Sequence, residues 1–549
     1  MYGKLYSACL YGIDGVLIEV ETDLSNGLPM VSIIGLPDTA VREAVERVRS
    51  AIKNCGYTFP LQRITINLAP ADLRKEGSAF DLAIALGLLT ASGQISLPLD
   101  EKVLIIGELA LDGALRPVTG VLPMVDLARR CGFHSVLLPV ENADEALLLE
   151  GVHIYGISHL NQLSFLKQAP DGRKQANPGM FVSSESTVST DQNASCRLEG
   201  ASASWSRLEY TRNSSTTPVA QIQQQPDNYS DVSGQRQVKR ALTIAAAGMH
   251  NLVLIGPPGT GKTMLIRRLP GILPDLSEEE ALEVTKIYSS AGKFKEFSHG
   301  LLKRRAFRSP HHTISAGGLV GGGPIPKPGE VSLAHKGVLF LDELPEFSRH
   351  VLEVLRQPLE ERMVTISRSR AAFTFPAHFL LAASMNPCHC GYLGSQPPLP
   401  RCTCSPGRIS QYRARISGPL LDRIDLQLEV PRPKTWNPDE VPISSEMMRE
   451  QVLFAQERQS RRLQGSGLSW NSELSGAMLR QSVKLRRDAE LLMTSSFDHL
   501  GLSMRAYDRI IKLARTIADL EDKEQVMAEH VAEAMQYRQL DKRSVDTEI

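Results

Sequence analysis

At 549 residues this chain is too long for one hydrophobic core, and we expect about three domains of roughly 100–200 residues each. Hydrophobic residues make up 42% and charged residues 22% of the sequence, as is typical of a soluble globular protein. Lysine plus arginine and aspartate plus glutamate both number 61, so the net charge indicates neither nucleic acid nor acidic lipid as a partner. Any basic surface must therefore be local.

The sequence predicts a cytoplasmic protein without a membrane partner. Residues 1–7 show no charged region followed by an apolar one, so no secretory signal is visible. The longest apolar stretch, residues 80–91, contains Asp81 and is shorter than the roughly 20 residues that a membrane-spanning helix needs. Eight cysteines in a chain of this length do not indicate a disulfide framework.

Residues 1–167 predict an α/β domain. Short apolar runs at 103–106 and 135–138 have the length and flanking turns of strands, and residues 39–54 and 81–91 carry apolar side chains at helical spacing.

Residues 168–226 predict a flexible polar linker. They are rich in Ser, Thr, Gln, Asn and Pro and lack apolar periodicity, so they cannot bury enough apolar surface to offset the entropy of ordering. A long ordered surface loop is the alternative.

A nucleotide-binding loop opens the next region. The apolar run 252–255 leads directly into a G-x-x-x-x-G-K-T sequence, formed by Gly256, Pro257, Pro258, Gly259, Thr260, Gly261, Lys262 and Thr263. The glycines let backbone N–H groups turn toward phosphates, Lys262 would neutralise the β and γ charges, and the Thr263 hydroxyl would hold Mg²⁺. A helix at 264–269 directs its positive N-terminus at the same anion. ATP and Mg²⁺ are the expected ligands.

A second apolar strand, residues 337–341, ends in two carboxylates. Asp342 can hold the Mg²⁺ through water, and Glu343 can polarise the attacking water as a general base. Acidic residues are also common in turns after buried strands. The pair therefore indicates a catalytic site only in combination with the phosphate-binding loop upstream.

The order of these elements resembles the AAA+ series of Walker A, Walker B and sensor 1. By that resemblance Asn386, after the strand 380–385, orients the lytic water. Residues 417–425 resemble the arginine-finger segment of magnesium-chelatase and MCM-like motors, so Arg423 would reach the γ-phosphate of a neighbouring subunit. Arg505, at the start of a predicted helix, resembles the cis arginine of sensor 2. A surface salt bridge is the alternative role for either arginine.

Two insertions are similar to those of one AAA+ branch. The long separation of Lys262 from Asp342 leaves room for an insert that includes residues 308–313 and the glycine-rich stretch 317–329. An apparent hairpin spans residues 363–375. The resemblance is to motors with a helix-2 insert and a pre-sensor-1 hairpin, two elements that face the central pore of a ring.

The whole chain apart from the linker resembles the ComM/YifB family of magnesium-chelatase-like AAA+ proteins. The resemblance implies an α/β fold with a Lon-protease-like N-terminal domain at 1–167, an ATPase core at 227–435 and a helical lid at 436–549. It also implies a hexameric DNA translocase or helicase that promotes branch migration in homologous recombination during natural transformation. Single-stranded and branched DNA are the implied partners, and recombination proteins are candidate partners.

Basic residues are compatible with DNA but do not require it. Residues 303–305 with Arg308 form a cluster, and Arg368 and Arg370 alternate on one face of the predicted hairpin. In a ring these charges would be repeated around the pore, where they could follow phosphates. A solvated charge run or ion pairs between subunits would give the same pattern. The alternative function is a chelatase-like motor that remodels a protein partner.

Two C-x-C pairs follow sensor 1, formed by Cys388, Cys390, Cys402 and Cys404. Four thiolates satisfy a tetrahedral structural Zn²⁺ site, and His389 could replace one of them. The spacing is tighter than the usual gap, so free thiols or a redox pair remain the alternative. Zinc would pin the loop between Asn386 and Arg423 and would have no catalytic role.

The N-terminal region resembles Lon-type proteases except at their catalytic positions. Residues 69–81 resemble the segment around the catalytic serine, and residues 107–118 the segment that leads to the catalytic lysine. The serine position falls on Ala79, with Ser78 beside it, and the lysine position falls near Leu122, where no lysine occurs. A serine without a base is a poor nucleophile, so we expect no peptidase activity. Casein degradation that depends on Ser78 would reopen the protease hypothesis.

Overall fold

The computed structural model describes residues 1–97, 102–166, 208–210, 227–296, 300–323, 326–368, 371–395, 400–432, 441–500 and 503–538. The chain forms two compact units, residues 1–219 with 285–301 and residues 220–284 with 302–549. Of the predicted linker only residues 208–210 are described, and there Glu209 forms a β-bridge with Tyr155. No helix in the described ranges has the length and apolar content to cross a membrane.

The first unit is built on a seven-stranded mixed sheet in the order β3-β4-β2-β1-β5-β8-β9. Its strands are β1 (Tyr2–Tyr11), β2 (Asp14–Ser25), β3 (Met30–Ile34), β4 (Arg63–Ala69), β5 (Val103–Ile105), β8 (Ser135–Pro139) and β9 (His153–Ile157). Strands β1, β2 and β4 pair antiparallel, whereas β5, β8 and β9 continue the sheet in parallel from β1. This mixed sheet confirms the predicted α/β class.

The helices predicted at the start of the chain have the expected bounds. They are α1 (Thr39–Asn54) and α2 (Asp81–Ala91), and the same unit contains α3 (Val121–Arg130), α4 (Ala143–Ala146) and the short strands β6 (Glu108–Leu109) and β7 (Leu115–Arg116). Helix α1 begins where the Asp38 carboxylate accepts a hydrogen bond from the Val41 N–H. Helix α2 is buried along most of its length, which is why its sequence is apolar on nearly every face.

The second unit contains five parallel strands in the order β11-β14-β17-β10-β18. They are β10 (Leu252–Ile255), β11 (Phe307–Arg308), β14 (Val338–Leu341), β17 (Leu380–Met385) and β18 (Leu426–Glu429). Leu252 and Leu254 pack into one hydrophobic cluster, whereas Val253 and Ile255 pack into another. Both faces of the sheet are therefore covered, as expected for parallel strands with continuous apolar runs.

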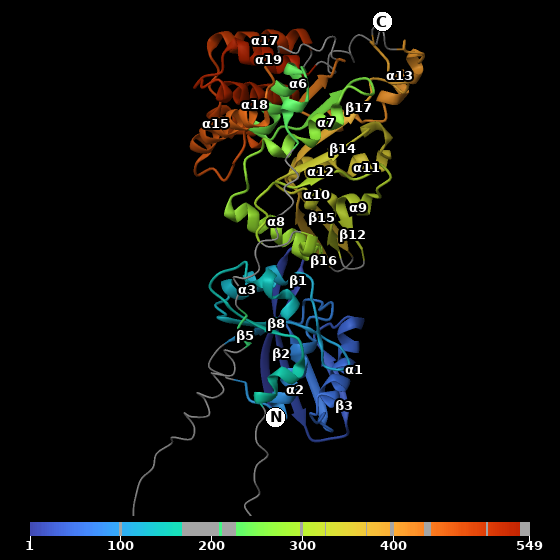
Figure 1. The fold of residues 1–549 in the computed structure, drawn as a ribbon, viewed down its shortest axis with the longest axis vertical. Helices are drawn as coiled ribbons and strands as arrows, with labels where there is room; N and C mark the ends of the chain where they lie inside the picture. The colour runs from blue at the N-terminus through green and yellow to red at the C-terminus, as the bar shows by residue number, and fades with distance from the viewer. Residues whose placement is uncertain are drawn as a thin grey trace, which may run out of the picture. The chain divides into compact units, whose positions relative to one another are not determined.

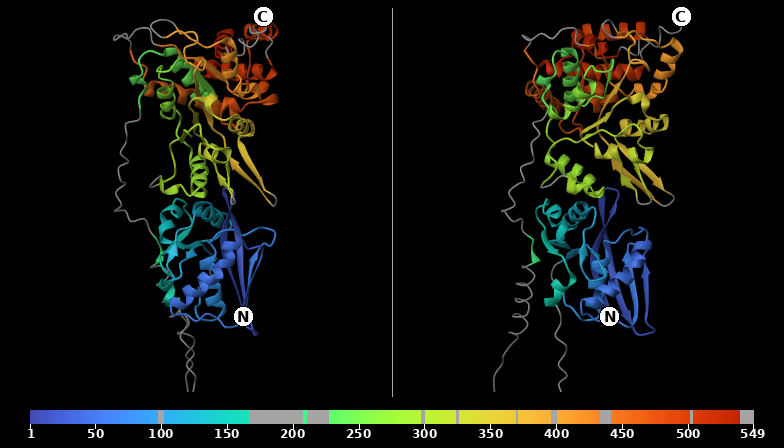
Figure 2. Two further views of the ribbon diagram at one scale, coloured as in Figure 1. Left: turned by 90° about the vertical axis from the view of Figure 1, so that its right-hand side faces the viewer. Right: turned by 45° about the vertical axis from the view of Figure 1, so that its right-hand side comes forward.

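Both predicted insertions are present in the second unit. The first contains α9 (Ala316–Val320), β12 (Gly321–Gly322), β13 (Lys327–Pro328) and α10 (Glu330–Leu333), and it follows α8 (Glu278–Ser290). The second is an antiparallel hairpin of β15 (Met363–Arg368) and β16 (Ala371–Pro376), which projects from the five-stranded sheet (Figure 2). The short helices nearby are α11 (Arg349–Val354), α12 (Arg356–Glu361), α13 (Pro406–Arg413) and α14 (Gly418–Leu421).

The C-terminal helices form a group in which α15 and α18 pack against α6 (Arg236–Gly248) and lie beside it in Figure 1. They are α15 (Ser445–Leu463), α16 (Gly476–Ser482), α17 (Arg487–Leu500), α18 (Met504–Leu520) and α19 (Ala528–Gln536). Apolar residues recur at helical spacing over residues 474–494, but this pattern is interrupted, because Leu485 forms a β-bridge with Val526. That long-range pairing divides the pattern between α16 and α17.

A buried carboxylate connects this helical region to the sheet. Asp425, just before β18, accepts hydrogen bonds from the Asn251 N–H at 3.2 Å and from Arg509 of α18 at 2.5 Å. Its other neighbour is the fully buried His250, at 3.4 Å. Burial raises the pKa of Asp425, but the charge of Arg509 and the bond to His250 outweigh that effect and hold the pKa below its ordinary value.

Removing this carboxylate is expected to destabilise the helical region. Asp425→Ala leaves Arg509 without its partner, which should lower the free energy of unfolding by about 3–5 kcal/mol. Because the folded-state pKa is depressed, the difference from wild type should be largest above about pH 4 and should shrink as the pH falls. Trp470 is fully buried among these helices, so its fluorescence in a Trp205→Phe/Trp436→Phe background reports the transition during urea titration. An unchanged midpoint would contradict the prediction.

Candidate ATP-hydrolysis site

The loop after β10 has the backbone conformation that the glycine-rich pattern predicts. Gly259 and Gly261 have φ angles of 78° and 83°, a region that favours glycine, and Gly261 caps the start of α7 (Lys262–Arg267). A Cβ at Gly256 would lie 2.5 Å from the Val430 carbonyl oxygen. These positions therefore require glycine because of backbone shape at two of them and close packing at the third.

The Lys262 ammonium is held inside this loop. Its Nζ donates to the carbonyl oxygens of Gly256 at 2.6 Å and Pro257 at 2.9 Å, and to Asn386 Oδ1 at 3.3 Å. Burial lowers the pKa of Lys262 from its ordinary value, while the charges of Asp342 and Glu343 oppose the shift. The loop thus presents a desolvated cation next to two carboxylates.

Asp342 joins the ends of three strands. Its Oδ2 accepts a hydrogen bond from the Thr263 hydroxyl at 3.0 Å, and its Oδ1 accepts one from the Ser384 hydroxyl. Thr263 follows β10, Asp342 follows β14 and Ser384 lies in β17, which pairs with both of those strands. The carboxyl ends of parallel strands meet at one edge of a sheet, so the topology brings these side chains together.

Glu343 has an unusual backbone conformation. Its φ and ψ are 54° and 52°, in the left-handed region, and its N–H donates to Ser384 Oγ at 3.3 Å. Such a conformation costs a non-glycine residue about 1–3 kcal/mol and occurs where the surrounding structure imposes it. The turn leaves the Glu343 side chain exposed beside the loop instead of in the core.

The backbone of Asn386 contacts a buried tyrosine. Tyr412 of α13 interacts with the backbone of Asn386, and burial raises the pKa of Tyr412 to about 12. The phenol is therefore neutral at physiological pH, and its hydroxyl can hold the Asn386 backbone.

Arg423 and Arg505 lie at a different place from the loop residues. The Arg423 guanidinium donates to the Pro419 carbonyl oxygen at 2.7 Å and pairs with Glu360. The Arg505 guanidinium is 4.0 Å from the same Glu360 carboxylate. The structure therefore groups the two arginines around one anion, although the resemblance assigns them to nucleotides of different subunits.

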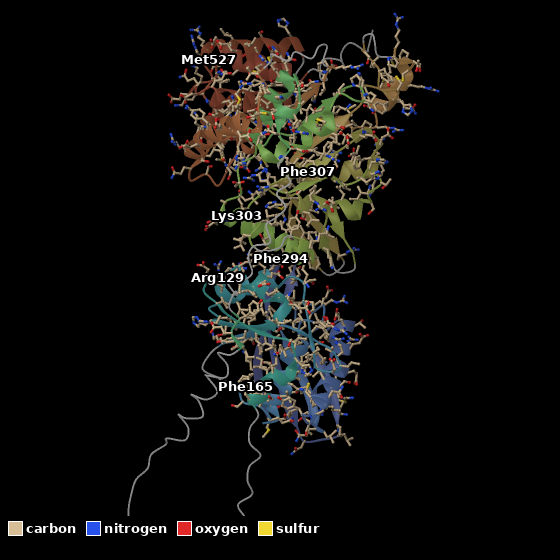
Figure 3. The ribbon with its side chains drawn as sticks, viewed as in Figure 1. Arg129, Phe165, Phe294, Lys303, Phe307 and Met527 are labelled. Atoms are coloured by element: carbon tan, nitrogen blue, oxygen red, sulfur yellow. The ribbon has the colours of Figure 1, made fainter. Side chains whose placement is uncertain are left out.

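Half of the predicted basic cluster is paired within the second unit. Arg305 is buried and donates to Glu280 at 3.2 Å, and Arg308 pairs with Glu330 at 2.6 Å. Lys303 and Arg304 are exposed, and Figure 3 labels Lys303. Of the clustered cations that could follow phosphates, Arg305 and Arg308 are therefore neutralised by acidic side chains of the same chain.

The hairpin arginines are only partly described. Arg368 is exposed and donates to the Gly323 carbonyl oxygen at 2.8 Å. Arg370 lies outside the described residues. The predicted alternation of the two arginines on one face therefore remains a prediction.

The four clustered cysteines have the arrangement of a metal site. The sulfur atoms of Cys388, Cys390, Cys402 and Cys404 all lie within 4.8 Å of one another. The separations of 3.3, 3.5 and 3.7 Å among the first three are close to the roughly 3.8 Å between sulfurs that a tetrahedron with Zn–S bonds of about 2.3 Å gives. The donor set therefore fits Zn²⁺.

His389 does not join the cysteine group. Its exposed ring lies 6.3 Å from the Tyr412 ring, and the ligand atoms that gather within 4.8 Å of one another are the four cysteine sulfurs, without a His389 nitrogen. The loop also contacts the nucleotide site, because a Cβ at Gly391 would be 2.9 Å from Pro258 Cδ. The cysteine cluster consequently lies next to the phosphate-binding loop in space.

In the N-terminal unit the peptidase positions carry no serine–lysine pair among the described residues. Ala79 and Leu122 are both buried, and the Ser78 hydroxyl donates to the Glu108 carboxylate. Lys75 is fully buried and donates to backbone carbonyl groups, including that of Leu73 at 2.8 Å. Its ammonium is thus occupied by structural hydrogen bonds.

Four residues at the two sites had no assigned role in the sequence: Asn251, Glu360, Ser384 and Tyr412. The Asn251 side chain donates to the Arg423 carbonyl oxygen at 3.0 Å and accepts from the Leu381 N–H at 2.8 Å. Each of the four side chains contacts a residue that is distant from it in the sequence. Only Ser384, which lies in the expected sensor-1 strand 380–385, belonged to a motif that the sequence identified.

Three family models match successive parts of the chain. The model described as "Magnesium chelatase, subunit ChlI" matches residues 228–437, "Subunit ChlI of Mg-chelatase" matches residues 20–142, and "Magnesium chelatase, subunit ChlI C-terminal" matches residues 442–538. Together they include the phosphate-binding loop, much of the first unit and the C-terminal helices.

Several proteins are similar over nearly the whole chain. YifB of Escherichia coli K12 is 42% identical over 545 residues, which are 98% of this chain and 97% of YifB. The competence protein ComM of Haemophilus influenzae is 41% identical over 539 residues, 97% of each chain. Lon protease 2 of Bacillus subtilis is 25% identical over 179 residues, which are 29% of this chain and 32% of the protease.

The bond from Ser384 to Asp342 gives a prediction about Mg²⁺. Ser384→Ala removes the hydroxyl that orients Asp342 and meets the Glu343 N–H, so the Mg²⁺ concentration for half-maximal ATP hydrolysis should rise about tenfold or more. ATPase assays over a Mg²⁺ titration measure this shift. Ser332→Ala is the matched control, because Ser332 is fully buried but its hydroxyl has no hydrogen-bond partner. Equal Mg²⁺ requirements in the two variants would disprove the role of Ser384.

Proposed function

We propose, because the chain belongs to the ComM/YifB family of magnesium-chelatase-like AAA+ proteins, that it is an ATP-driven motor that translocates DNA and promotes branch migration. The observation that carries the DNA assignment is the 41% identity over nearly the full chain to a protein named for competence. The proposed setting is homologous recombination during natural transformation, in the cytoplasm.

ATP hydrolysis is assigned to residues at the loop. Lys262 exchanges its carbonyl partners for the β- and γ-phosphates, and Thr263 with Asp342 supplies the oxygen ligands that Mg²⁺ prefers. Bound Mg²⁺ would neutralise charge that develops on the phosphate oxygens. Glu343 accepts the proton of the attacking water, which Asn386 orients.

The two arginines act at a subunit interface in this proposal. We assign the chain to a hexameric ring in which Arg423 reaches the γ-phosphate of the neighbouring subunit. Arg505 is assigned, as the cis arginine of sensor 2, to the nucleotide of its own subunit. The proposed domains are a Lon-like domain without peptidase activity at 1–167, a linker at 168–226, the ATPase core at 227–435 and the lid at 436–549.

The cysteine cluster is assigned to structural Zn²⁺. Four sulfur ligands complete a tetrahedral site and leave no open position for catalysis. Contact of Gly391 with Pro258, and the position of Cys388 two residues after Asn386, would make the metal a support for the phosphate-binding loop and for sensor 1.

DNA contact is assigned to exposed cations in the hairpin and just before the first insertion. Lys303, Arg304 and Arg368 are exposed, whereas Arg305 and Arg308 are paired with carboxylates. Repetition of three cations per subunit around a ring would provide a sequence-independent track for phosphates.

The zinc assignment predicts a measurable metal content. The purified protein should contain about one Zn²⁺ per chain, detected by mass spectrometry and by a chromogenic chelator after thiol modification. Cys402→Ser should remove the metal and lower the affinity for ATP, because the loop against Pro258 loses its anchor. Cys131→Ser is the control, since Cys131 is exposed and lies outside the cluster. Retention of zinc by Cys402→Ser, or wild-type protein that takes up none, would contradict the assignment.

The motor assignment predicts coupling between ATP hydrolysis and DNA. ATP hydrolysis by the purified protein should increase with single-stranded DNA, and a labelled three-strand junction should dissociate in the same reaction. Glu343→Gln should abolish both activities by more than about 100-fold, because the attacking water loses its base. A Lys303→Ala/Arg304→Ala variant should bind DNA more weakly, with a salt slope reduced by about two.

Two results would redirect the assignment. ATP hydrolysis that no DNA stimulates would leave the ATPase intact and end the branch-migration proposal. Stimulation by a protein alone would favour the chelatase-like motor that remodels a partner.

A further inference from the structure

Glu360 lies between the two arginines. It belongs to α12, and its side chain is 56% exposed. Its Oε2 accepts a hydrogen bond from Arg423, while its Oε1 is 4.0 Å from Nη2 of Arg505. Each oxygen of one carboxylate therefore faces a different guanidinium group.

The Arg423 side chain is largely buried in this arrangement. Its side chain is only 9% exposed, and one of its amino groups donates to the Pro419 carbonyl oxygen one helical turn earlier. The buried Nε has no hydrogen-bond partner. An unpaired buried donor is unfavourable, so this position does not satisfy every polar group of Arg423.

The pair of arginines is held together by a separate contact. Asp425, two residues beyond Arg423, binds Arg509 of α18, and Arg505 is in the first turn of the same helix. The spacing between Arg423 and Arg505 is thus set by a buried ion pair that does not involve Glu360. The exposed carboxylate can leave while the two arginines keep their relative placement.

A phosphate group offers the arginines the same contacts as Glu360, with more of them. Both are anions with several oxygen acceptors, but a terminal phosphate has three oxygens and more negative charge. The hydrogen bond from Arg423 and the charges of Arg423 and Arg505 also lower the pKa of Glu360, so the carboxylate remains charged. Glu360 and a phosphate would therefore compete for one position.

We propose that Glu360 occupies the anion position between Arg423 and Arg505 in the subunit without a neighbour, and that the γ-phosphate of the ATP bound by a neighbouring subunit displaces it from Arg423 when that arginine engages the nucleotide. This inference rests on the proposed function, because it takes Arg423 to act in ATP hydrolysis. Glu360 is then a carboxylate that neutralises the arginines until ATP replaces it. Its removal favours the engaged state.

Glu360→Gln tests this competition, because glutamine has nearly the same size and carries no charge. The ATP concentration for half-maximal hydrolysis should fall about two- to fivefold, as expected from the strength of an exposed ion pair, while kcat stays unchanged. Glu361→Gln is the matched control in the same helix, since the Glu361 carboxylate binds Gln357 instead of an arginine. Urea unfolding monitored by Trp470 fluorescence establishes that both variants are folded.

The Arg423→Ala variant distinguishes a failure of the role proposed for Glu360 from a failure of the role assigned to Arg423. Loss of hydrolysis in Arg423→Ala, with a lowered half-saturating ATP concentration in Glu360→Gln alone, supports the inference. If Arg423→Ala is inactive and Glu360→Gln has a reduced kcat or an unchanged half-saturating concentration, the role of Glu360 is overturned and the motor assignment stands. If Arg423→Ala hydrolyses ATP normally, the assigned role of Arg423 fails, and the inference fails with it.

Discussion

The position of the Asp342 carboxylate is the constraint on which the candidate site depends. One oxygen meets Thr263 and the other meets Ser384, so a single side chain ties the phosphate-binding loop to the ends of two neighbouring strands. The parallel order of β14, β17 and β10 makes this possible, since all three strands end at the same edge. Ser384 also accepts a hydrogen bond from the N–H of Glu343, whose left-handed backbone is thereby supported.

Further contacts extend from this edge into neighbouring loops. Tyr412 interacts with the Asn386 backbone, Gly391 approaches Pro258, and Lys262 donates to Asn386. A change in the cysteine-bearing loop would therefore reach both the phosphate-binding loop and the residue assigned to the lytic water. A structural metal at the cysteines, as proposed, would thus affect nucleotide binding without any direct contact with nucleotide.

Two carboxylates near the arginines differ in burial, and the difference separates their physical roles. Asp425 is buried against Arg509 and His250, where the loss of one partner leaves an uncompensated charge, so it fixes the helical region on the sheet. Glu360 is more than half exposed, where water and salt weaken the ion pair with Arg423. The first contact is suited to permanent support and the second to exchange.

Elements that depend on local sequence patterns were predictable before the fold was known. The strand and loop at 252–263, the hairpin at 363–375 and the helices at 39–54 and 81–91 were all predictable, because periodicity and glycine placement act over a few residues. Which charges are free depends instead on contacts between residues that are distant in the sequence. Arg305 and Arg423 look like exposed cations in the sequence, yet Glu280 and Glu360 neutralise them across 25 and 63 residues of chain. The break between α16 and α17 has the same origin, since the pairing of Leu485 with Val526 joins distant segments and overrides helical periodicity.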